Sequence, residues 1–312
     1  SRKWGESLLF SILFLFFLSA CTGKKEKHSA LPELQTLTFG LMPSFDGLPS
    51  LVAVRQGIYD SLDIKIDFIT YASATDRDAA FLSGKLDGML TDYPGATLLQ
   101  AKGSRLRLVM ETDGSLSLIA SKKSNVRNPD DLKGKNISVS GNTFVEYATD
   151  EVMNKPEINN IPLRLMMLED GQISASFLPG PATAIALNDG HTALLNTRQM
   201  GLRCTGIVFS EKAITEKDEE IRRFITGYNL GVKYLQTRPQ NEWTEILVKE
   251  FGLQEKAAMQ IDLPDYRPAT RPSYHDIEKI IAWLKSKGAI PDYYPGENLV
   301  DTTFIPGTLK PQ

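Results

Sequence analysis

The chain has 312 residues, of which 42% are hydrophobic and 23% are charged, and its formal net charge is −3. This composition is normal for a soluble globular protein with one large or two ordinary domains, and it lacks the basic excess that nucleic-acid binding requires. Two cysteines, Cys21 and Cys204, are too few for a disulfide framework or a cysteine-rich metal site.

Residues 1–20 have the pattern of a secretory signal peptide. A positively charged start precedes the apolar run at 8–18, which is shorter than the roughly 20 residues that a membrane-spanning helix needs. The tetrapeptide that ends at Cys21 (Leu-Ser-Ala-Cys) resembles the bacterial lipobox, which implies cleavage before Cys21 and lipid attachment to its sulfur. The polar residues 21–34 are then expected to form a lipidated tether.

From residue 35 onward, short apolar runs alternate with helical patterns, as is typical of α/β units around mainly parallel sheets. Cap residues, glycines and prolines mark the expected element ends. The first half predicts strands at 37–41, 64–71, 86–90, 106–111 and 115–121, and helices at 48–57, 75–84 and 94–103.

The pattern then restarts and ends in a helical tail. The second half predicts a helical turn at 128–132, strands at 135–140, 172–178, 191–196 and 203–209, and helices at 143–154, 162–169, 181–189, 218–236, 241–251 and 274–287. Two similar halves predict two lobes, with extended crossings near 118–122 and 202–208. The first lobe would comprise residues 35–120 and 206–312, and the second lobe residues 121–205.

An ordered set of short motifs carries a resemblance over nearly all of residues 35–306. The motifs are Gly-Leu-Met-Pro at 40–43, Ala-Phe-Leu-Ser-Gly-Lys-Leu-Asp-Gly at 80–88, Asp-Leu-Lys-Gly-Lys at 131–135 and Leu-Pro-Gly-Pro at 178–181. In this order the chain resembles the solute-binding lipoproteins of bacterial ABC importers for sulfonates, taurine, nitrate and thiamine-pyrimidine precursors. The resemblance implies the type II periplasmic-binding-protein fold, a two-lobe clamshell whose mainly parallel, mixed sheets are flanked by helices and joined by two hinge crossings.

Two positions depart from the pattern of that family. Ser174 stands where an Asp usually follows Gly-Gln-Ile, and Gly180 stands where the Leu-Pro-Glu-Pro turn has its Glu.

Ligands of open α/β sheets bind beyond the carboxyl ends of the strands, and this rule selects a set of loops as the candidate cleft. Small hydroxyl residues and aromatics are frequent in these loops, and they suit a polar, flat solute. The alternative is that the aromatics pack in the core. The candidate ligand-binding residues are Ser44, Phe45, Asp46, Tyr71, Ser73, Thr75, Asp92, Tyr93, Asn142, Thr143, Phe144 and Pro179.

The charges in these loops bear on the solute. They contain Asp46, Asp92 and Asp113 but no Arg or Lys, whereas an anionic ligand usually recruits Arg. We therefore expect a neutral or cationic heteroaromatic solute, such as a thiamine-pyrimidine precursor. An aliphatic sulfonate, taurine or nitrate is the alternative that the resemblance leaves open.

Catalysis is not expected. The resemblance extends to an enzyme branch that makes the thiamine pyrimidine, and such an enzyme would need a reactive lysine, a histidine and a cysteine-rich iron site, for which the candidate loops offer no residues. No catalytic residue, cofactor or metal is therefore predicted. The expected protein is an exported monomer, lipid-anchored at the periplasmic face or the outer surface of the cytoplasmic membrane, with a permease and an ATPase as partners. A sensory or structural lipoprotein with the same clamshell is the remaining alternative.

Overall fold

The computed structural model describes residues 33–152 and 158–306. The predicted signal peptide and the predicted lipidation site Cys21 lie outside the described residues. Within the described part of the chain, no helix is both long and apolar enough to cross a bilayer.

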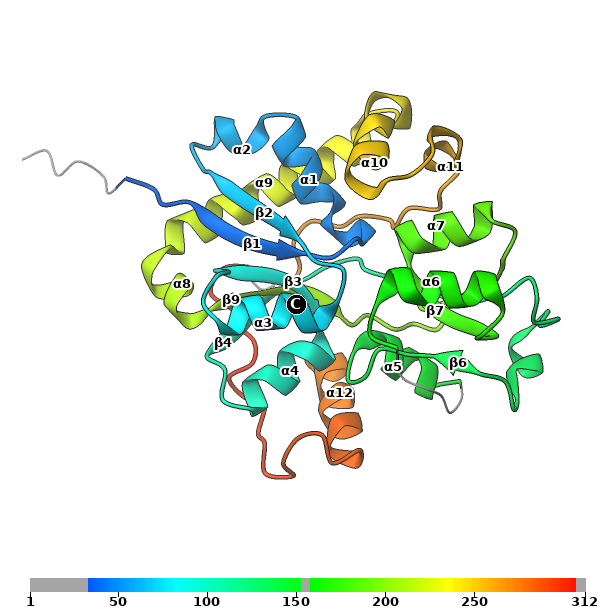
Figure 1. The fold of residues 1–312 in the computed structure, drawn as a ribbon. Helices are drawn as coiled ribbons and strands as arrows, with labels where there is room; N and C mark the ends of the chain where they lie inside the picture. Colours follow the sequence, from blue (N-terminus) through cyan, green and yellow to red (C-terminus); the bar gives the residue numbers. More distant parts are fainter. Residues whose placement is uncertain (1–32, 153–157, 307–312) are drawn as a thin grey trace, which may run out of the picture. The chain divides into compact units, whose positions relative to one another are not determined.

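The first sheet has five strands in the order β2-β1-β3-β9-β4 (Figure 1). β1 runs parallel to β2 and β3, and β9 runs antiparallel to β3 and β4. The strands are β1 (Leu37–Leu41), β2 (Ile66–Thr70), β3 (Gly88–Asp92), β4 (Leu106–Glu111) and β9 (Thr205–Ser210). β1, β3 and β9 are almost fully buried, as expected for strands covered on both faces.

The second sheet has four strands in the order β6-β7-β5-β8. β5 is antiparallel to both of its neighbours, and β6 is parallel to β7. The strands are β5 (Leu116–Ala120), β6 (Ile137–Ser138), β7 (Ala175–Pro179) and β8 (Thr192–Asn196). We call the first sheet with its helices the first lobe, and the second sheet with its helices the second lobe.

The two crossings between the sheets follow from this strand order. The chain leaves the first sheet after β4 and enters the second at β5, so the first crossing is residues 112–115 and the predicted crossing at 118–122 lies in and just after β5. The second crossing, residues 197–204, overlaps the prediction. The sheets are mixed and mainly parallel, as expected, because one strand in each sheet runs against the others. These strands are β9 and β5, which follow the two crossings and are antiparallel to both of their neighbours.

Helices cover both sheets, and most match the predicted segments (Figure 1). The first lobe has α1 (Leu48–Arg55), α2 (Ile58–Ser61), α3 (Ala74–Leu82) and α4 (Tyr93–Ala101), and the second has α5 (Phe144–Asp150), α6 (Ile161–Asp170) and α7 (Gly180–Asn188). The tail has α8 (Glu211–Glu216), α9 (Asp218–Thr237), α10 (Thr244–Phe251), α11 (Glu255–Met259) and α12 (Tyr274–Ser286). The short helices α2, α8 and α11 were not predicted, because four to six residues are too few for a helical period to be visible.

Three-residue and four-residue 3₁₀ turns complete the backbone, at η1 (Phe45–Gly47), η2 (Pro129–Leu132) and η3 (Gln240–Glu242).

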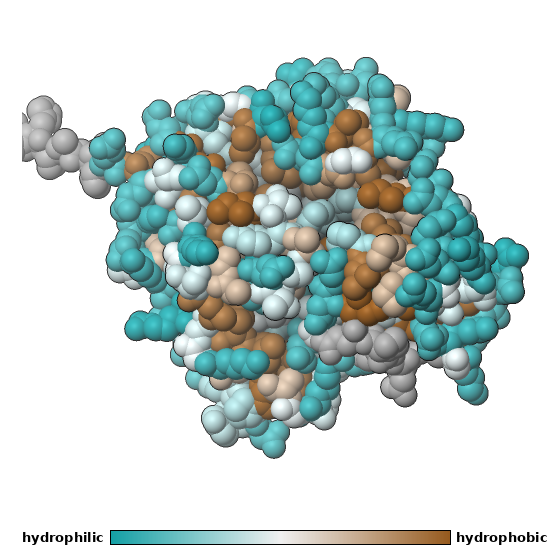
Figure 2. All heavy atoms as spheres, viewed as in Figure 1, coloured by the Kyte–Doolittle hydropathy of each residue, from teal (hydrophilic) through white to brown (hydrophobic). Residues whose placement is uncertain are grey.

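One apolar core runs from the first lobe into the second. It contains Met89 of β3 and Tyr93 of α4 from the first lobe, and Phe144 and Phe177 from the second lobe, and all four are nearly inaccessible to solvent. The outer surface is largely hydrophilic in Figure 2, with several separate hydrophobic patches. Because the core takes residues from both lobes, the lobes pack against each other through apolar side chains.

Candidate functional site

A cavity of about 100 Å³ lies between the strand ends of the two lobes. Both lobes contribute to its wall, so a molecule held there would contact both. The lining residues are Met42, Pro43, Ser44, Asp46, Ala74, Arg77, Leu90, Thr91, Asp92, Thr205, Leu116, Ser140, Thr143, Phe144, Val145, Asn159, Ile161, Arg164 and Pro179.

On the first-lobe wall, Asp92 ends β3 and is the N-cap of α4. Its Oδ1 accepts a hydrogen bond from the Gly95 amide at 2.7 Å, which satisfies one of the free amides of the first helical turn. Burial raises the pKa of this carboxyl, although the nearby Arg77 guanidinium opposes the rise. Asp92 is therefore fixed by secondary structure while it faces the cavity.

The second-lobe wall is built around the start of α5. Thr143 is the N-cap, and its Oγ1 accepts from the Val145 amide at 3.2 Å. Phe144, the first helical residue, is only 2% exposed and presents an aromatic side chain to the cavity. Pro179 closes this wall at the end of β7.

A direct hydrogen bond joins the two walls. The second oxygen of Asp92, Oδ2, accepts from the backbone amide of Phe144 at 2.8 Å. The Asp92 carboxylate thus caps α4 in its own lobe, and it also accepts a hydrogen bond from the first amide of α5 in the other lobe. Because this bond exists only when the lobes are together, it favours the closed arrangement of the cavity.

Asp46 connects the cavity to the first crossing. It is 2% exposed, and it accepts hydrogen bonds from the Ser44 hydroxyl and, at 2.8 Å, from the Thr112 hydroxyl. Burial raises the pKa of Asp46, and these two donors act against the rise. In turn, the Thr205 hydroxyl, where the second crossing ends, donates to the Thr112 carbonyl at 3.2 Å.

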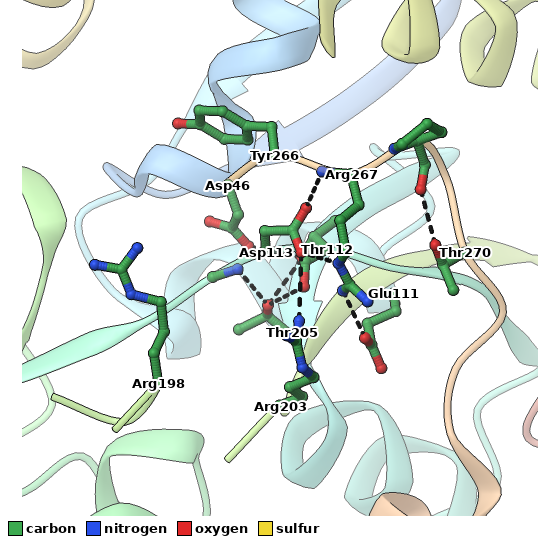
Figure 3. A network of polar contacts seen from close by, with 12 residues as sticks. Asp46, Glu111, Thr112, Asp113, Arg198, Arg203, Thr205, Tyr266, Arg267 and Thr270 are labelled. Carbon is green, nitrogen blue, oxygen red and sulfur yellow. Dashed lines mark hydrogen bonds and ion pairs between the residues drawn. The ribbon is translucent and has the colours of Figure 1, made fainter. Parts of the chain in front are cut away.

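Arg267, in the segment before α12, binds the end of β4 and the first crossing (Figure 3). Its Nε donates to Asp113 Oδ1 at 2.6 Å, and its Nη2 donates to Glu111 Oε1 at 2.8 Å. Arg203 of the second crossing lies 3.6 Å from Asp113 Oδ1. We call Glu111, Asp113, Arg203 and Arg267 the hinge network, because they surround both crossings.

The structure brings together six of the twelve predicted binding residues. Ser44, Asp46, Asp92, Thr143, Phe144 and Pro179 all line the cavity.

The other six lie elsewhere. Phe45 packs edge-on against Phe251, Ser73 caps α3, and Thr75 is exposed on that helix. Tyr93 is fully buried, and its hydroxyl donates to Glu111 at 2.8 Å.

The remaining two lie at the margins. Tyr71 packs at the edge of the core, and Asn142 accepts from the Lys287 ammonium at 3.2 Å. Of the four aromatic candidates, Phe45, Tyr71, Tyr93 and Phe144, only Phe144 lines the cavity, because the other side chains are turned into or along the core.

Two arginines at the cavity escaped the sequence analysis. Arg77 and Arg164 are 4% and 2% exposed, and they enter from the interiors of α3 and α6, whereas the charge argument considered only loops. The candidate loops contain no Arg or Lys, but two helical arginines reach the cavity, so the absence of cations from the loops does not disfavour an anionic solute. Arg77 lies between Asp76 and Asp78, which is the pattern of a solvated helix surface. Arg164 lies among the mainly apolar residues Ile161 to Leu168, and a lone Arg there gives a weak signal of a buried cation.

The pairing of the two arginines differs. Arg77 donates to Asp78 at 2.8 Å and to the Leu90 carbonyl at 3.1 Å, so its charge is compensated. Arg164 donates from Nη1 to the Ile158 carbonyl at 3.0 Å, and its Nε has no hydrogen-bond partner.

Metal binding has no support in the part of the chain that the structure describes. Residues 33–152 and 158–306 contain no group of three or more His, Cys, Asp or Glu side chains placed to hold a metal ion.

The chain is similar to several known proteins. The model of the family described as NMT1/THI5 like matches residues 44–242. A Haemophilus influenzae protein named for thiamine biosynthesis is 22% identical over 308 residues, which cover 90% of this chain and 94% of that protein.

Solved structures show the same fold. The alkanesulfonate-binding protein SsuA from Xanthomonas axonopodis pv. citri, bound to MOPS, superposes with a TM-score of 0.68 at 18% identity, covering 84% of this chain and 96% of that one. The periplasmic nitrate-binding protein NrtA from Synechocystis PCC 6803 gives 0.72 at 14% identity, covering 84% and 83%. The expected two-lobe binding-protein architecture is confirmed.

Proposed function

This chain belongs to the NMT1/THI5-like family, and from that premise we propose that it is the solute-binding component of an ABC importer. One observation carries the proposal. The cavity wall is divided between two lobes that are joined by two crossings, and Asp92 bonds to Phe144 across the cavity. A solute that contacts both walls stabilises the closed arrangement over the open one, and a permease can recognise that difference.

For the solute, we propose a small, flat heteroaromatic molecule such as a thiamine-pyrimidine precursor. The Phe144 ring offers an apolar face, and the carboxylates of Asp46 and Asp92 can accept hydrogen bonds from ring amino groups. The name of the Haemophilus influenzae relative supports this choice. The names of SsuA and NrtA support the alternatives, a sulfonate or nitrate.

A thermal-shift screen of the purified protein tests the proposal. The panel contains pyrimidines, thiamine intermediates, riboflavin, alkanesulfonates, taurine, nitrate and polyamines. A ligand that binds only the native state adds about 2.7 kcal/mol at a hundredfold excess over its Kd. Stabilisation by a pyrimidine supports the heteroaromatic solute, and stabilisation by a sulfonate or nitrate alone replaces it. If no solute stabilises the protein, the import function fails and a sensory or structural role takes its place.

For location, we propose that the protein is exported and anchored through lipid on Cys21. The lipobox resemblance supports this, and a lipid anchor would keep the binding protein close to its permease. Labelling of cells with a radioactive fatty acid should mark the wild-type protein and leave Cys21→Ser unlabelled. Label on the Cys21→Ser variant, or none on either protein, contradicts the anchor but leaves solute binding untouched.

A further inference from the structure

A buried positive charge lies on the second-lobe wall of the cavity. Arg164 belongs to α6, is 2% exposed and lines the cavity together with Ile161 of the same helix. Guanidinium groups are rarely buried without a paired anion, because burial removes the water that stabilises the charge. The surroundings of this arginine therefore need an explanation.

Within the described residues, no carboxylate forms an ion pair with Arg164. Among the described residues, the Arg164 guanidinium donates one hydrogen bond, to the backbone carbonyl of Ile158, and its Nε has no partner. Burial lowers the pKa of Arg164 to about 10, and no neighbouring acid acts against that shift. The group is therefore still charged at neutral pH, with donor capacity left unused.

A second unpaired group lies on the facing wall. Thr91 is 4% exposed, lines the same cavity, and its Oγ1 also lacks a hydrogen-bond partner. Buried polar atoms in native proteins are nearly always satisfied, so two unsatisfied atoms around one cavity indicate that a molecule completes them.

Arg77 does not share this role. Its guanidinium pairs with Asp78 at 2.8 Å. Arg77 therefore has an anionic partner of its own, whereas Arg164 has none among the described residues. The cavity thus has acceptors on the first-lobe wall, at Asp46 and Asp92, and an uncompensated cation on the second-lobe wall.

We propose that Arg164 binds an anionic group of the solute, a carboxylate, sulfonate or phosphate, and that the solute lies with this group toward α6. The inference rests on the proposed solute-binding function and adds the charge of the solute and its orientation. A planar guanidinium with free N–H donors suits an oxyanion, and the low polarity around it strengthens the contact.

The test measures charge preference with probe pairs that differ in one group. The pairs are orotate and uracil, nicotinate and nicotinamide, 1-propanesulfonate and 1-propanol, and 4-amino-5-hydroxymethyl-2-methylpyrimidine with and without its phosphate. Isothermal titration compares the wild type with Arg164→Gln, Arg164→Lys and, as the matched control, Arg127→Gln. Arg127 is an exposed arginine of the same lobe.

We expect at least one acidic probe to bind the wild type about tenfold or more tightly than its neutral twin. Arg164→Gln should bring this ratio close to one, Arg164→Lys should keep part of it, and Arg127→Gln should keep all of it. If neutral probes bind as well as acidic ones, or Arg164→Gln keeps the preference, the role of Arg164 is overturned while solute binding stands. If no probe binds and no solute of the wider panel does, both proposals fall.

A second measurement needs no ligand. Because Arg164 lacks an anionic partner, Arg164→Met should leave the melting temperature of the free protein unchanged or raise it. A fall of more than about 5 °C would show that Arg164 holds the fold together, and it would count against a role in binding.

Discussion

The carboxylate of Asp92 accepts a hydrogen bond of 2.8 Å from the backbone amide of Phe144, which lies in the other lobe. The same carboxylate caps α4 through the Gly95 amide at 2.7 Å. One side chain therefore couples the start of a first-lobe helix to the start of a second-lobe helix. Separation of the lobes breaks only the bond to Phe144, so its loss should affect closure more than local folding.

Asp92→Ala should therefore favour the open form. The control is Ser73→Ala, which removes the N-cap of α3. The Ser73 hydroxyl accepts from the Asp76 amide, so this hydrogen bond stays within the first lobe. Both variants should lose about 1–2 kcal/mol of unfolding free energy, measured by urea denaturation. Only Asp92→Ala should increase the radius of gyration in small-angle scattering. Equal compactness of the two variants would show that the interlobe bond does not control closure.

Asp46 provides a pH-dependent prediction. Burial raises the pKa of this carboxyl above its ordinary value of 3.8, so the native state binds the proton more tightly than the unfolded state. The contribution of Asp46 to stability is then present at low pH, and it is lost as the pH rises from about 4 through the raised pKa.

Asp46→Asn removes this titration. Its amide keeps one acceptor oxygen for the Ser44 or the Thr112 hydroxyl, and the other hydroxyl can rotate to accept from the amide nitrogen. The unfolding free energy of the variant relative to the wild type should rise as the pH increases above about 4. Denaturation in urea across this range measures the difference, and the other raised carboxyl, that of Asp92, is present in both proteins. A constant difference across the range would mean that Asp46 has the same pKa in both states.

The strand and helix order was predictable because the signals are local. Apolar runs of five or six residues, cap residues and prolines fixed most elements to within a few residues, as for α4, where Asp92 caps and Pro94 follows. Strand direction was less accessible, since β5 and β9 resemble any other buried strand, and only the tertiary path makes them antiparallel.

The site was predictable only where backbone position decides it. Ser44, Asp92 and Thr143 follow strand ends or cap helices, and they line the cavity as expected. Tyr93 follows a strand end too, but its ring turns into the core toward Glu111. Arg164 was missed because its place in the cavity depends on how α6 packs, which no local pattern reveals.

The hinge network should contribute to stability. Arg267 pairs with Glu111 and Asp113, whose side chains are 4% and 6% exposed. Its removal leaves the buried Glu111 without a cationic partner and leaves Asp113 with the more distant Arg203 alone. Arg267→Met should lower the unfolding free energy by about 2 kcal/mol. This lies below the usual cost of breaking a buried pair, because the arginine side chain is itself partly exposed. Lys249→Ala removes an exposed ion pair with Glu245 on α10 and should cost less than about 0.5 kcal/mol. A similar loss in both variants would mean that water already screens the hinge network.

The Gly180 departure from the family pattern has a steric cause. A Cβ at this position would lie 2.1 Å from Phe45 Cδ2, because the phenyl ring of the first lobe fills the space that a side chain would need. Gly180→Ala should therefore cost about 1–3 kcal/mol of unfolding free energy, or force the lobes apart. Gly47→Ala is the matched control, since its Cβ would meet the nearest atom at an ordinary 3.5 Å.

Phe45→Leu tests the cause directly. The smaller side chain should recover at least half of the loss when it is combined with Gly180→Ala, so the double-mutant cycle should give a coupling of about 1 kcal/mol between the two positions. Urea denaturation of the wild type, both single variants and the double variant supplies the four free energies. If the losses of unfolding free energy in the two single variants simply add in the double variant, the destabilisation by Gly180→Ala arises within α7 itself. In that case the Phe45 ring would not be what excludes a side chain at position 180.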